Sequence, residues 1–167
     1  MKNPKKEKKE KLMDGVVLSL DPGSVNEVQI VYTRPKLDTL RKVSGSHEVY
    51  EILKDIYPSD RITYKEFFYA VFLNAGNYVL AVSKVSEGGM MGTIVDLREV
   101  FQLALKLSAT IIILSHNHPI GNLRPSHTDK LITRKIVEAG KILDITVYDH
   151  LIVTQEGYFS FADEGLL

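Results

Sequence analysis

Residues 110–130 read TIIILSHNHPIGNLRPSHTDK, and this stretch contains three successive local patterns. The run IIIL is apolar and rich in β-branched residues, which predicts a strand that is buried on both faces. Pro119, Gly121 and Pro125 then predict a tight loop, because proline and glycine favour turn conformations. Ser126 opens a helical pattern that has Asp129 in its first turn. The stretch therefore predicts a strand, a loop and a helix.

The flanking sequence continues this mixture of strands and helices. Apolar residues at helical spacing predict a helix with Ser46 as N-cap and Pro58 at its end, and a second such pattern follows Asp96. The helix that begins near Ser126 is expected to end near Gly140. Strands are predicted at residues 27–33, 66–74, 78–86, 143–153 and 158–161. This order predicts an α/β fold, a three-layer-like sandwich with a mixed sheet.

The N-terminal region differs in composition from the rest of the chain. Residues 1–12 contain six lysines and two glutamates and have little apolar surface, which is typical of a flexible tail. A weak nucleic-acid arm is the alternative interpretation of these lysines. We therefore predict a flexible basic tail and a short strand in residues 1–45, followed by one compact domain in residues 46–167.

Composition excludes several classes of protein. The chain has no cysteine, so disulfides, thiolate catalysis and cysteine-ligated zinc are excluded. Lysine plus arginine equals aspartate plus glutamate at 21 each, so no global field attracts nucleic acid or anionic membranes. No apolar run approaches the roughly 20 residues of a membrane span, and the N-terminus lacks the apolar region of a secretory signal. We expect a cytoplasmic protein without a membrane partner.

The five histidines of the chain include a pair, His116 and His118, at the end of the predicted buried strand. Residues i and i+2 of a strand point to the same side, so the two imidazoles project together and Asn117 points away. The following loop returns the chain to a helix whose first turn carries Asp129, which can reach both rings. Two histidines and one aspartate leave one position of a tetrahedral Zn²⁺ site open for water, as in catalytic zinc sites.

Each of these residues also has a structural interpretation. Ser126 and Asp129 have the spacing of a capping box, and the two histidines could be satisfied by backbone groups at a strand end. Hydrolysis needs a further carboxylate that accepts a proton, and Glu66, at the start of a buried strand, is the candidate base. Glu66 could instead be a solubilising charge at a strand edge. Glu87 is the substitute base, although a charge in a hairpin is its simpler role.

His150 is a further candidate for a role at this site. Leu143, Ile145, Val147, Leu151 and Val153 are predicted to share one face of their strand, which places His150 on the opposite face. His150 could donate a hydrogen bond to the metal site as an outer residue, or it could be a satisfied structural histidine.

The spacing of His116, His118, Ser126 and Asp129 matches the H-x-H-x7-S-x2-D signature of the JAMM (JAB/MPN-type) metallopeptidase superfamily. The segments SHNHPIGNLRPS, EAGKILDITVYDHLIV, GYFSFADEG and GTIVDLREVFQLAL resemble its RadC-like bacterial branch, and the resemblance covers residues 46–167. It implies a cytidine-deaminase-like α/β fold with His116, His118 and Asp129 as zinc ligands. It also implies that Glu66 is the general base and that Ser126 helps to stabilise the oxyanion.

Two features depart from the resemblance. Ile120 stands where relatives often carry a small hydroxyl residue, and residues 1–45 show no helix-hairpin-helix pattern of the kind that precedes the domain in longer RadC proteins. The leading hypothesis is a zinc-dependent hydrolase of peptide or isopeptide bonds, with a peptide or protein substrate that the sequence does not identify. The alternative is a DNA-associated repair or recombination accessory protein with a structural or vestigial metal, with weak nucleic-acid contact through the lysine-rich tail.

Overall fold

The computed structural model describes residues 9–13, 16–20, 27–30, 32–33, 35–89 and 94–167. The chain divides into two compact units, Met1–Arg34 and Pro35–Leu167. The second unit begins before the predicted domain start at Ser46, because residues 41–43 pair with the start of a strand of the sheet: Val43 donates to the backbone oxygen of Asn77, and Val79 to that of Arg41. The predicted division at residue 45, into a flexible tail with a short strand and one compact domain, remains a prediction.

The first unit is an antiparallel sheet of three strands, β1 (Lys9–Met13), β2 (Val16–Leu20) and β3 (Glu27–Ile30), in the order β1-β2-β3. The predicted strand at residues 27–33 corresponds to β3. Residues 9–12, which we expected in a flexible tail, lie instead in β1 and pair with β2. The partner strand β2 has the mostly apolar sequence VVLSL, which is typical of a strand. Residues 1–8 lie outside the described part of the chain.

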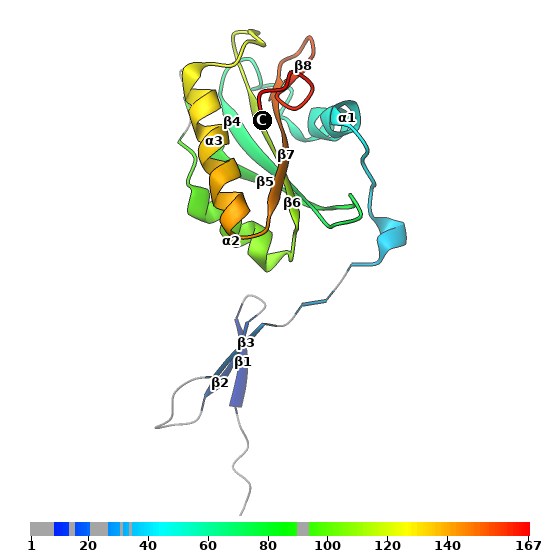
Figure 1. Cartoon of the computed structure of the whole chain (residues 1–167), viewed down its shortest axis with the longest axis vertical. Coiled ribbons are helices and arrows are strands. Elements are labelled where there is room, and N and C mark those ends of the chain that lie inside the picture. The colour runs from blue at the N-terminus through cyan, green and yellow to red at the C-terminus, as the bar shows by residue number, and fades with distance from the viewer. Residues whose placement is uncertain (1–8, 14–15, 21–26, 31, 34, 90–93) are drawn as a thin grey trace, which may run out of the picture. The chain divides into compact units, whose positions relative to one another are not determined.

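The second unit is built on a five-stranded mixed sheet with the order β5-β4-β6-β7-β8 (Figure 1). Only the β6–β7 pair is parallel among these strands. In chain order, its elements are η1 (Leu37–Thr39), α1 (Ser46–Ile56), β4 (Phe67–Leu73), β5 (Val79–Glu87), α2 (Leu97–Lys106), β6 (Ile111–Asn117), α3 (His127–Ile142), β7 (Thr146–Val153) and β8 (Tyr158–Ser160). The predicted order of helices and strands in this unit is confirmed.

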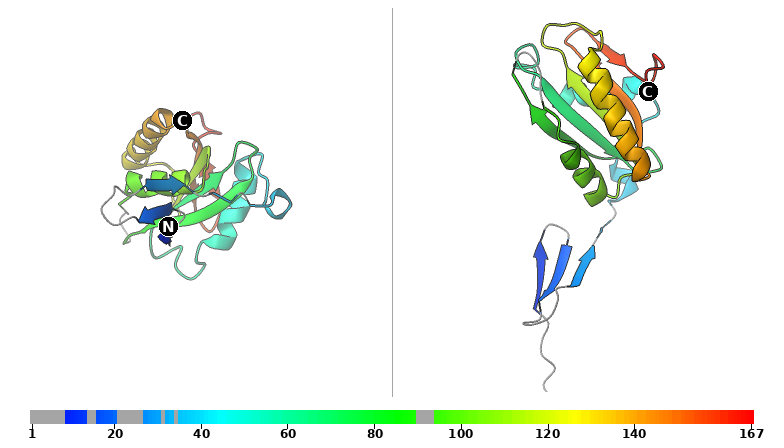
Figure 2. Two further views of the ribbon diagram at one scale, coloured as in Figure 1. Left: turned by 90° about the horizontal axis from the view of Figure 1, so that it is seen from below. Right: turned by 60° about the vertical axis from the view of Figure 1, so that its left-hand side comes forward.

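Helices cover both faces of the sheet, so the predicted three-layer α/β architecture is confirmed (Figure 1). Successive residues of a strand point to opposite faces, and β4 is buried along its whole length. Its residues Phe67, Tyr69, Val71 and Leu73 join the core on the side of α1. Phe68, Ala70 and Phe72 join the core on the side of α2 and α3, where α3 runs across the sheet (Figure 2). The central strands are therefore apolar on both faces.

The face assignment that we predicted for residues 143–153 is wrong in one respect. Ile145 and Val147 pack in the core on the side of α2 and α3, whereas Leu151 and Val153 pack on the side of α1. The cause is a register shift between Ile112 and Ile113, which pair with Val147 and Asp149 and leave Tyr148 as an extra residue. After the bulge, the side chains of His150 and Leu151 point to opposite faces of the sheet, as predicted.

Two expected helix termini also differ from the structure. Gly45 is the N-cap of α1, and Ser46 is its first residue; the Ser46 hydroxyl donates to Asp163 at 2.6 Å. Gly140 lies in the last turn of α3, which ends two residues later at Ile142, and the C-cap is Leu143. A Cβ atom at Gly140 would lie 2.4 Å from the backbone oxygen of Ile145. The glycine therefore permits close approach of the following chain. Among the described residues, none of the helices has the length and apolar character needed to cross a membrane.

Candidate metal centre

The two histidines of the candidate site are held at the C-terminal end of β6. His116 is paired with Phe68 of β4 on one side and with Ile152 of β7 on the other, and its side chain is 2% exposed. His118 lies just after the strand, where its backbone nitrogen donates to the oxygen of Val153 at 3.2 Å. The pairing of the backbone on both sides fixes the two rings on one face, as the alternation of a strand predicts.

Asp129 is held by the N-terminus of α3. Ser126 is the N-cap; its hydroxyl accepts from the backbone of Asp129 at 3.1 Å, and the Asp129 carboxylate accepts from the backbone of Ser126 at 2.7 Å. The capping box that we considered as the structural alternative is therefore present. The same carboxylate also faces the histidines, with His116 Nε2 at 3.4 Å from Oδ1 and His118 Nε2 at 3.5 Å from Oδ2. Capping and facing the histidines are compatible in this geometry.

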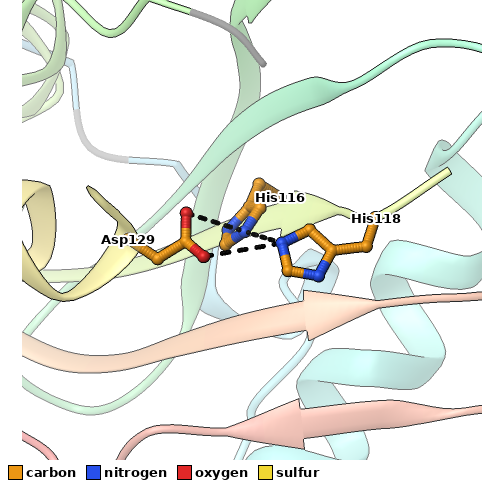
Figure 3. A group of neighbouring side chains, drawn as sticks. All are labelled: His116, His118 and Asp129. Carbon is orange, nitrogen blue, oxygen red and sulfur yellow. Dashed lines mark hydrogen bonds and ion pairs between the residues drawn. The ribbon is translucent and has the colours of Figure 1, made fainter. Parts of the chain in front are cut away.

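The three side chains converge on one point (Figure 3). The two Nε2 atoms are 3.0 Å apart, and His116, His118 and Asp129 each offer one atom within 4.8 Å of the others. Ligands of a tetrahedral zinc ion, at about 2.0–2.1 Å from the metal, lie roughly 3.4 Å from one another. The observed spacings fit such an ion, and two nitrogens with one oxygen form a donor set that zinc and several other divalent metals accept.

Hydrogen bonding on the outer side of His118 orients its ring toward this point. His118 Nδ1 contacts the backbone oxygen of Asn122, which can only accept, so Nδ1 is the nitrogen that carries the hydrogen. In the neutral ring, Nε2 then carries no hydrogen, and its lone pair is directed at His116 and Asp129. Two ring nitrogens at 3.0 Å from each other and close to a carboxylate need a proton or a cation between them.

The electrostatics of the site also favour positive charge. Burial acts to lower the pKa of His118, but the hydrogen bonds to Asp129 and to the backbone of Asn122 outweigh burial and raise it. Burial acts to raise the pKa of Asp129, but its contacts with His116 and His118 outweigh burial and hold it well below the usual range. The carboxylate is therefore ionised, and the pair attracts a cation.

The candidate metal site opens into a cleft of about 810 Å³. Glu66, Ser126, His116, His118 and Asp129 all contribute to its wall. Glu66 precedes β4, and its backbone exchanges hydrogen bonds with the hairpin end, donating to Gly89 and accepting from Gly88. The structure thus brings the predicted base and the predicted oxyanion residue to the same cleft as the three predicted ligands. Their chemical roles remain predictions.

Glu87, the substitute base, has a different environment. Its carboxylate contacts Lys65 Nζ at 2.8 Å, Lys84 Nζ at 2.7 Å and Arg61 Nη1 at 3.5 Å. Hydrogen bonds from the two lysines lower its pKa to about 2. Glu87 does not line the cleft, and a carboxylate with so low a pKa is a poor base at neutral pH. The geometry therefore favours Glu66 over Glu87.

Asn117 and Thr133 have contacts near the site that the sequence did not predict, whereas His150 occupies the outer position that was one of its two predicted alternatives. Asn117 accepts from the backbone of Phe67 at 2.7 Å and donates to the oxygens of Ile62 at 2.6 Å and Lys65 at 2.8 Å, so it holds the chain on both sides of Glu66. His150 and Thr133 lie behind His116, with His116 Nδ1 at 2.8 Å from His150 Nε2. For Thr133 the sequence did contain a signal, because its position four residues after Asp129 places both on one helix face.

Comparison with known proteins gives consistent matches. A family model described as the RadC-like JAB domain matches residues 43–166. A relative named UPF0758 protein, from Flavobacterium johnsoniae, is 46% identical over 127 residues, which cover 76% of this chain and 54% of the relative. A UPF0758 protein from Symbiobacterium thermophilum is 49% identical over 102 residues, covering 61% of this chain and 44% of the relative. A UPF0758 protein from Methanococcoides burtonii is 40% identical over 130 residues, covering 78% of this chain and 56% of the relative.

The chain therefore spans about half the length of the curated relatives it matches. The matched region includes Glu66, the histidine pair, Ser126 and Asp129. The resemblance that the H-x-H-x7-S-x2-D spacing indicated is confirmed at the level of the family. From residue 43 to residue 166 the sequence follows one family model, and the chain belongs to the RadC-like JAB domain family.

Proposed function

We propose that this protein is a zinc-dependent hydrolase that cleaves amide bonds in a peptide or isopeptide substrate. One observation carries the proposal: His116, His118 and Asp129 converge at the wall of a cleft that Glu66 also lines. Convergence of possible ligands alone would equally suit a structural metal. A carboxylate in the same cleft, outside the ligand group, supports hydrolysis instead.

His116, His118 and Asp129 would hold the metal, and the cleft would supply its open position. Zinc in such a site polarises a carbonyl and lowers the pKa of water. Glu66 is proposed to accept the proton of the attacking water and to deliver it to the leaving amine nitrogen. The hydroxyl of Ser126 accepts a hydrogen bond from the backbone of Asp129, so its own hydrogen is oriented by the cap and can be donated to the substrate oxygen.

The wall of the cleft supports a peptide as substrate. Its rim carries two exposed isoleucines, Ile94 at 91% and Ile120 at 87% exposure, together with Arg124. Exposed apolar side chains at a concave site give contact area to the side chains of a bound chain. The isoleucine at position 120, where the family resemblance led us to expect a small hydroxyl residue, lies at this rim and not among the ligands.

The test combines metal content with turnover in two matched glutamate variants. Glu66→Gln keeps the size of the side chain but removes the base, so it is expected to retain zinc and to lose about 10²- to 10⁴-fold in hydrolysis of fluorogenic peptide and isopeptide libraries. Glu87→Gln, the control, is expected to retain both zinc and rate.

The possible outcomes separate the roles. Loss of zinc from Glu66→Gln would make Glu66 a ligand. A rate loss in Glu87→Gln, with Glu66→Gln unaffected, would reverse the assignment. A wild-type protein that binds zinc and cleaves no library member would contradict the hydrolase and leave a binding role for the metal.

A further inference from the structure

A buried chain of hydrogen bonds runs behind the two candidate ligands that lie deepest in the site. His116 Nδ1 is 2.8 Å from His150 Nε2, and His150 Nδ1 is 2.6 Å from the hydroxyl of Thr133. The same hydroxyl is 2.6 Å from the backbone oxygen of Asp129. His116, His150 and Thr133 are each 2% exposed or less. The chain therefore connects β6, β7 and α3 without contact with solvent.

The hydrogens of this chain have one consistent direction. The backbone oxygen of Asp129 can only accept, so the single hydroxyl hydrogen of Thr133 is donated to it. Thr133 must then accept from His150, which places the hydrogen of His150 on Nδ1. A neutral imidazole carries one N–H, so His150 Nε2 accepts, and His116 donates to it from Nδ1.

This direction determines which nitrogen of His116 faces the metal site. With the hydrogen on Nδ1, the Nε2 atom of His116 has a free lone pair, and Nε2 is the atom 3.0 Å from His118 Nε2 and 3.4 Å from Asp129. The opposite tautomer would direct an N–H into the position of the metal. The orientation of a metal-binding histidine by an outer hydrogen bond is a general requirement of such sites.

We propose that His150 and Thr133 are positioning residues that hold His116 in the tautomer with an unprotonated Nε2. Because Thr133 also binds the backbone of Asp129, these two residues couple ligands from β6 and α3. The inference rests on the metal-binding part of the proposed function, and not on hydrolysis. Under this proposal His150 supports a metal ligand, and it is not a structural histidine unrelated to the site.

Packing alone is the competing explanation for His150. Its ring stacks on Phe161 with a centroid distance of 4.9 Å and meets the edge of Phe68 at 5.5 Å, so it fills space in the core as well. Two substitutions separate the effects. His150→Phe retains an aromatic ring and removes both hydrogen bonds, whereas His150→Gln retains an acceptor and a donor in a smaller side chain.

A second pair of variants tests the other end of the chain. Thr133→Val has nearly the same shape as threonine and removes the hydroxyl, and Thr133→Ser, its control, keeps the hydroxyl. The full-length proteins are compared in two measurements. The first is the tautomer of His116, determined by ¹H–¹⁵N NMR of the metal-free protein at a pH well above the usual imidazole pKa of about 6.5. The second is the Kd for zinc, determined by competition with a chelator.

We expect the hydrogen of His116 on Nδ1 in the wild type, in His150→Gln and in Thr133→Ser. His150→Phe should lose this preference and bind zinc about 10- to 100-fold more weakly, with Thr133→Val changed in the same direction. Hydrogen on Nε2 in the wild type, an unchanged Kd in His150→Phe, or equal losses in the Phe and Gln variants would overturn the proposal.

The two hypotheses fail in different ways. If the wild type binds no zinc, the proposed function fails, while the tautomer measurement still decides the inference. If the wild type binds zinc and the tautomer is the same in all variants, only the inference fails. If His150→Phe does not fold, the Thr133 pair provides the same two measurements with a smaller change in the core.

Discussion

The last residues of β6 present polar side chains on both faces of the sheet, and the two faces differ in how these groups are satisfied. Ser115 and Asn117, on the side of α1, have fixed partners within the chain: the Tyr57 hydroxyl lies 2.9 Å from Ser115, and Asn117 makes three hydrogen bonds to the backbone. His116, on the other side, points its Nε2 at His118 Nε2 at 3.0 Å and at the Asp129 carboxylate at 3.4 Å, and all three groups are acceptors when both imidazoles are neutral and carry their hydrogen on Nδ1.

This difference indicates which buried polar groups stabilise the fold and which are available to bind a cation. A buried polar group with matched partners contributes to stability and holds neighbouring segments in place. Converging acceptors without a donor are costly until a cation enters, so they contribute most in the bound state. The following changes test this distinction, from the largest expected effect to the smallest.

Asn117→Ala is expected to lower the free energy of unfolding by about 3 kcal/mol or more. It leaves the N–H of Phe67 and the oxygens of Ile62 and Lys65 without their partner, and each unpaired buried group costs about 1–3 kcal/mol. Urea unfolding measures the loss. The exposed Asn122, changed to alanine as a control, should cost less than about 1 kcal/mol. Equal stability of the two variants would contradict a structural role for Asn117.

Zinc should stabilise the wild type and not Asp129→Ala. At a zinc concentration of 100 times Kd, linkage predicts an increase of about 2.7 kcal/mol in the free energy of unfolding. Removal of one of the three possible ligands should abolish this increase, whereas Asp163→Ala, at an exposed acid outside the cleft, should retain it. Thermal unfolding with zinc and with chelator measures the difference. A full zinc response in Asp129→Ala would remove Asp129 from the ligand group.

Lower pH should release zinc, because the imidazoles bind metal only when neutral. In the metal-free site, burial acts to lower the pKa of His118, but the contacts with Asp129 and Asn122 outweigh burial and raise it. Protons therefore compete with zinc for His118 already at a pH above the usual imidazole pKa of about 6.5. Each pH unit below that raised pKa should weaken binding about tenfold per protonated ligand. Zinc titrations across pH 5–8 measure this, and a constant Kd throughout would point to other ligands.

Without zinc, protonation of His118 has a different consequence, because it stabilises the folded state. A group whose pKa is higher in the folded than in the unfolded state stabilises the fold when protonated. The contribution of His118 should be complete below its unfolded pKa of about 6.5 and should disappear as pH rises through the folded value. Unfolding of the chelated protein against pH is the measurement, with Asp129→Ala as the variant in which the effect should be reduced.

Tyr57→Phe should have the smallest effect, a loss of about 1 kcal/mol in the free energy of unfolding. The substitution keeps the buried ring, which packs against Phe67 and Tyr69, and removes only the hydroxyl that contacts Ser115. Zinc affinity should be unchanged, because Tyr57 lies on the side of α1. A clear change in zinc Kd would show that the two faces are coupled. Calorimetry and the chelator competition measure the two quantities.

Local patterns were sufficient to predict much of this architecture. The apolar runs predicted β4 and β6, and the serine and aspartate spacing predicted the capping box of α3, because strand alternation and capping depend on neighbouring residues. The bulge at Tyr148 was not predicted, since a register shift depends on the partner strand. Nor could local patterns distinguish Glu66 from Glu87, because the three cations around Glu87 come from residues 61, 65 and 84.

The sequence alone therefore determined the layer architecture, the family and the group of His116, His118 and Asp129. Each follows from short-range spacing: a period of two in a strand, a tight loop and the first turn of a helix. The tertiary structure alone decided the partners of Asn117, the chain from His116 through His150 to Thr133, and the cleft that Glu66 shares with the site. These contacts join residues far apart in sequence, and their geometry is set by strand pairing and packing across the sheet.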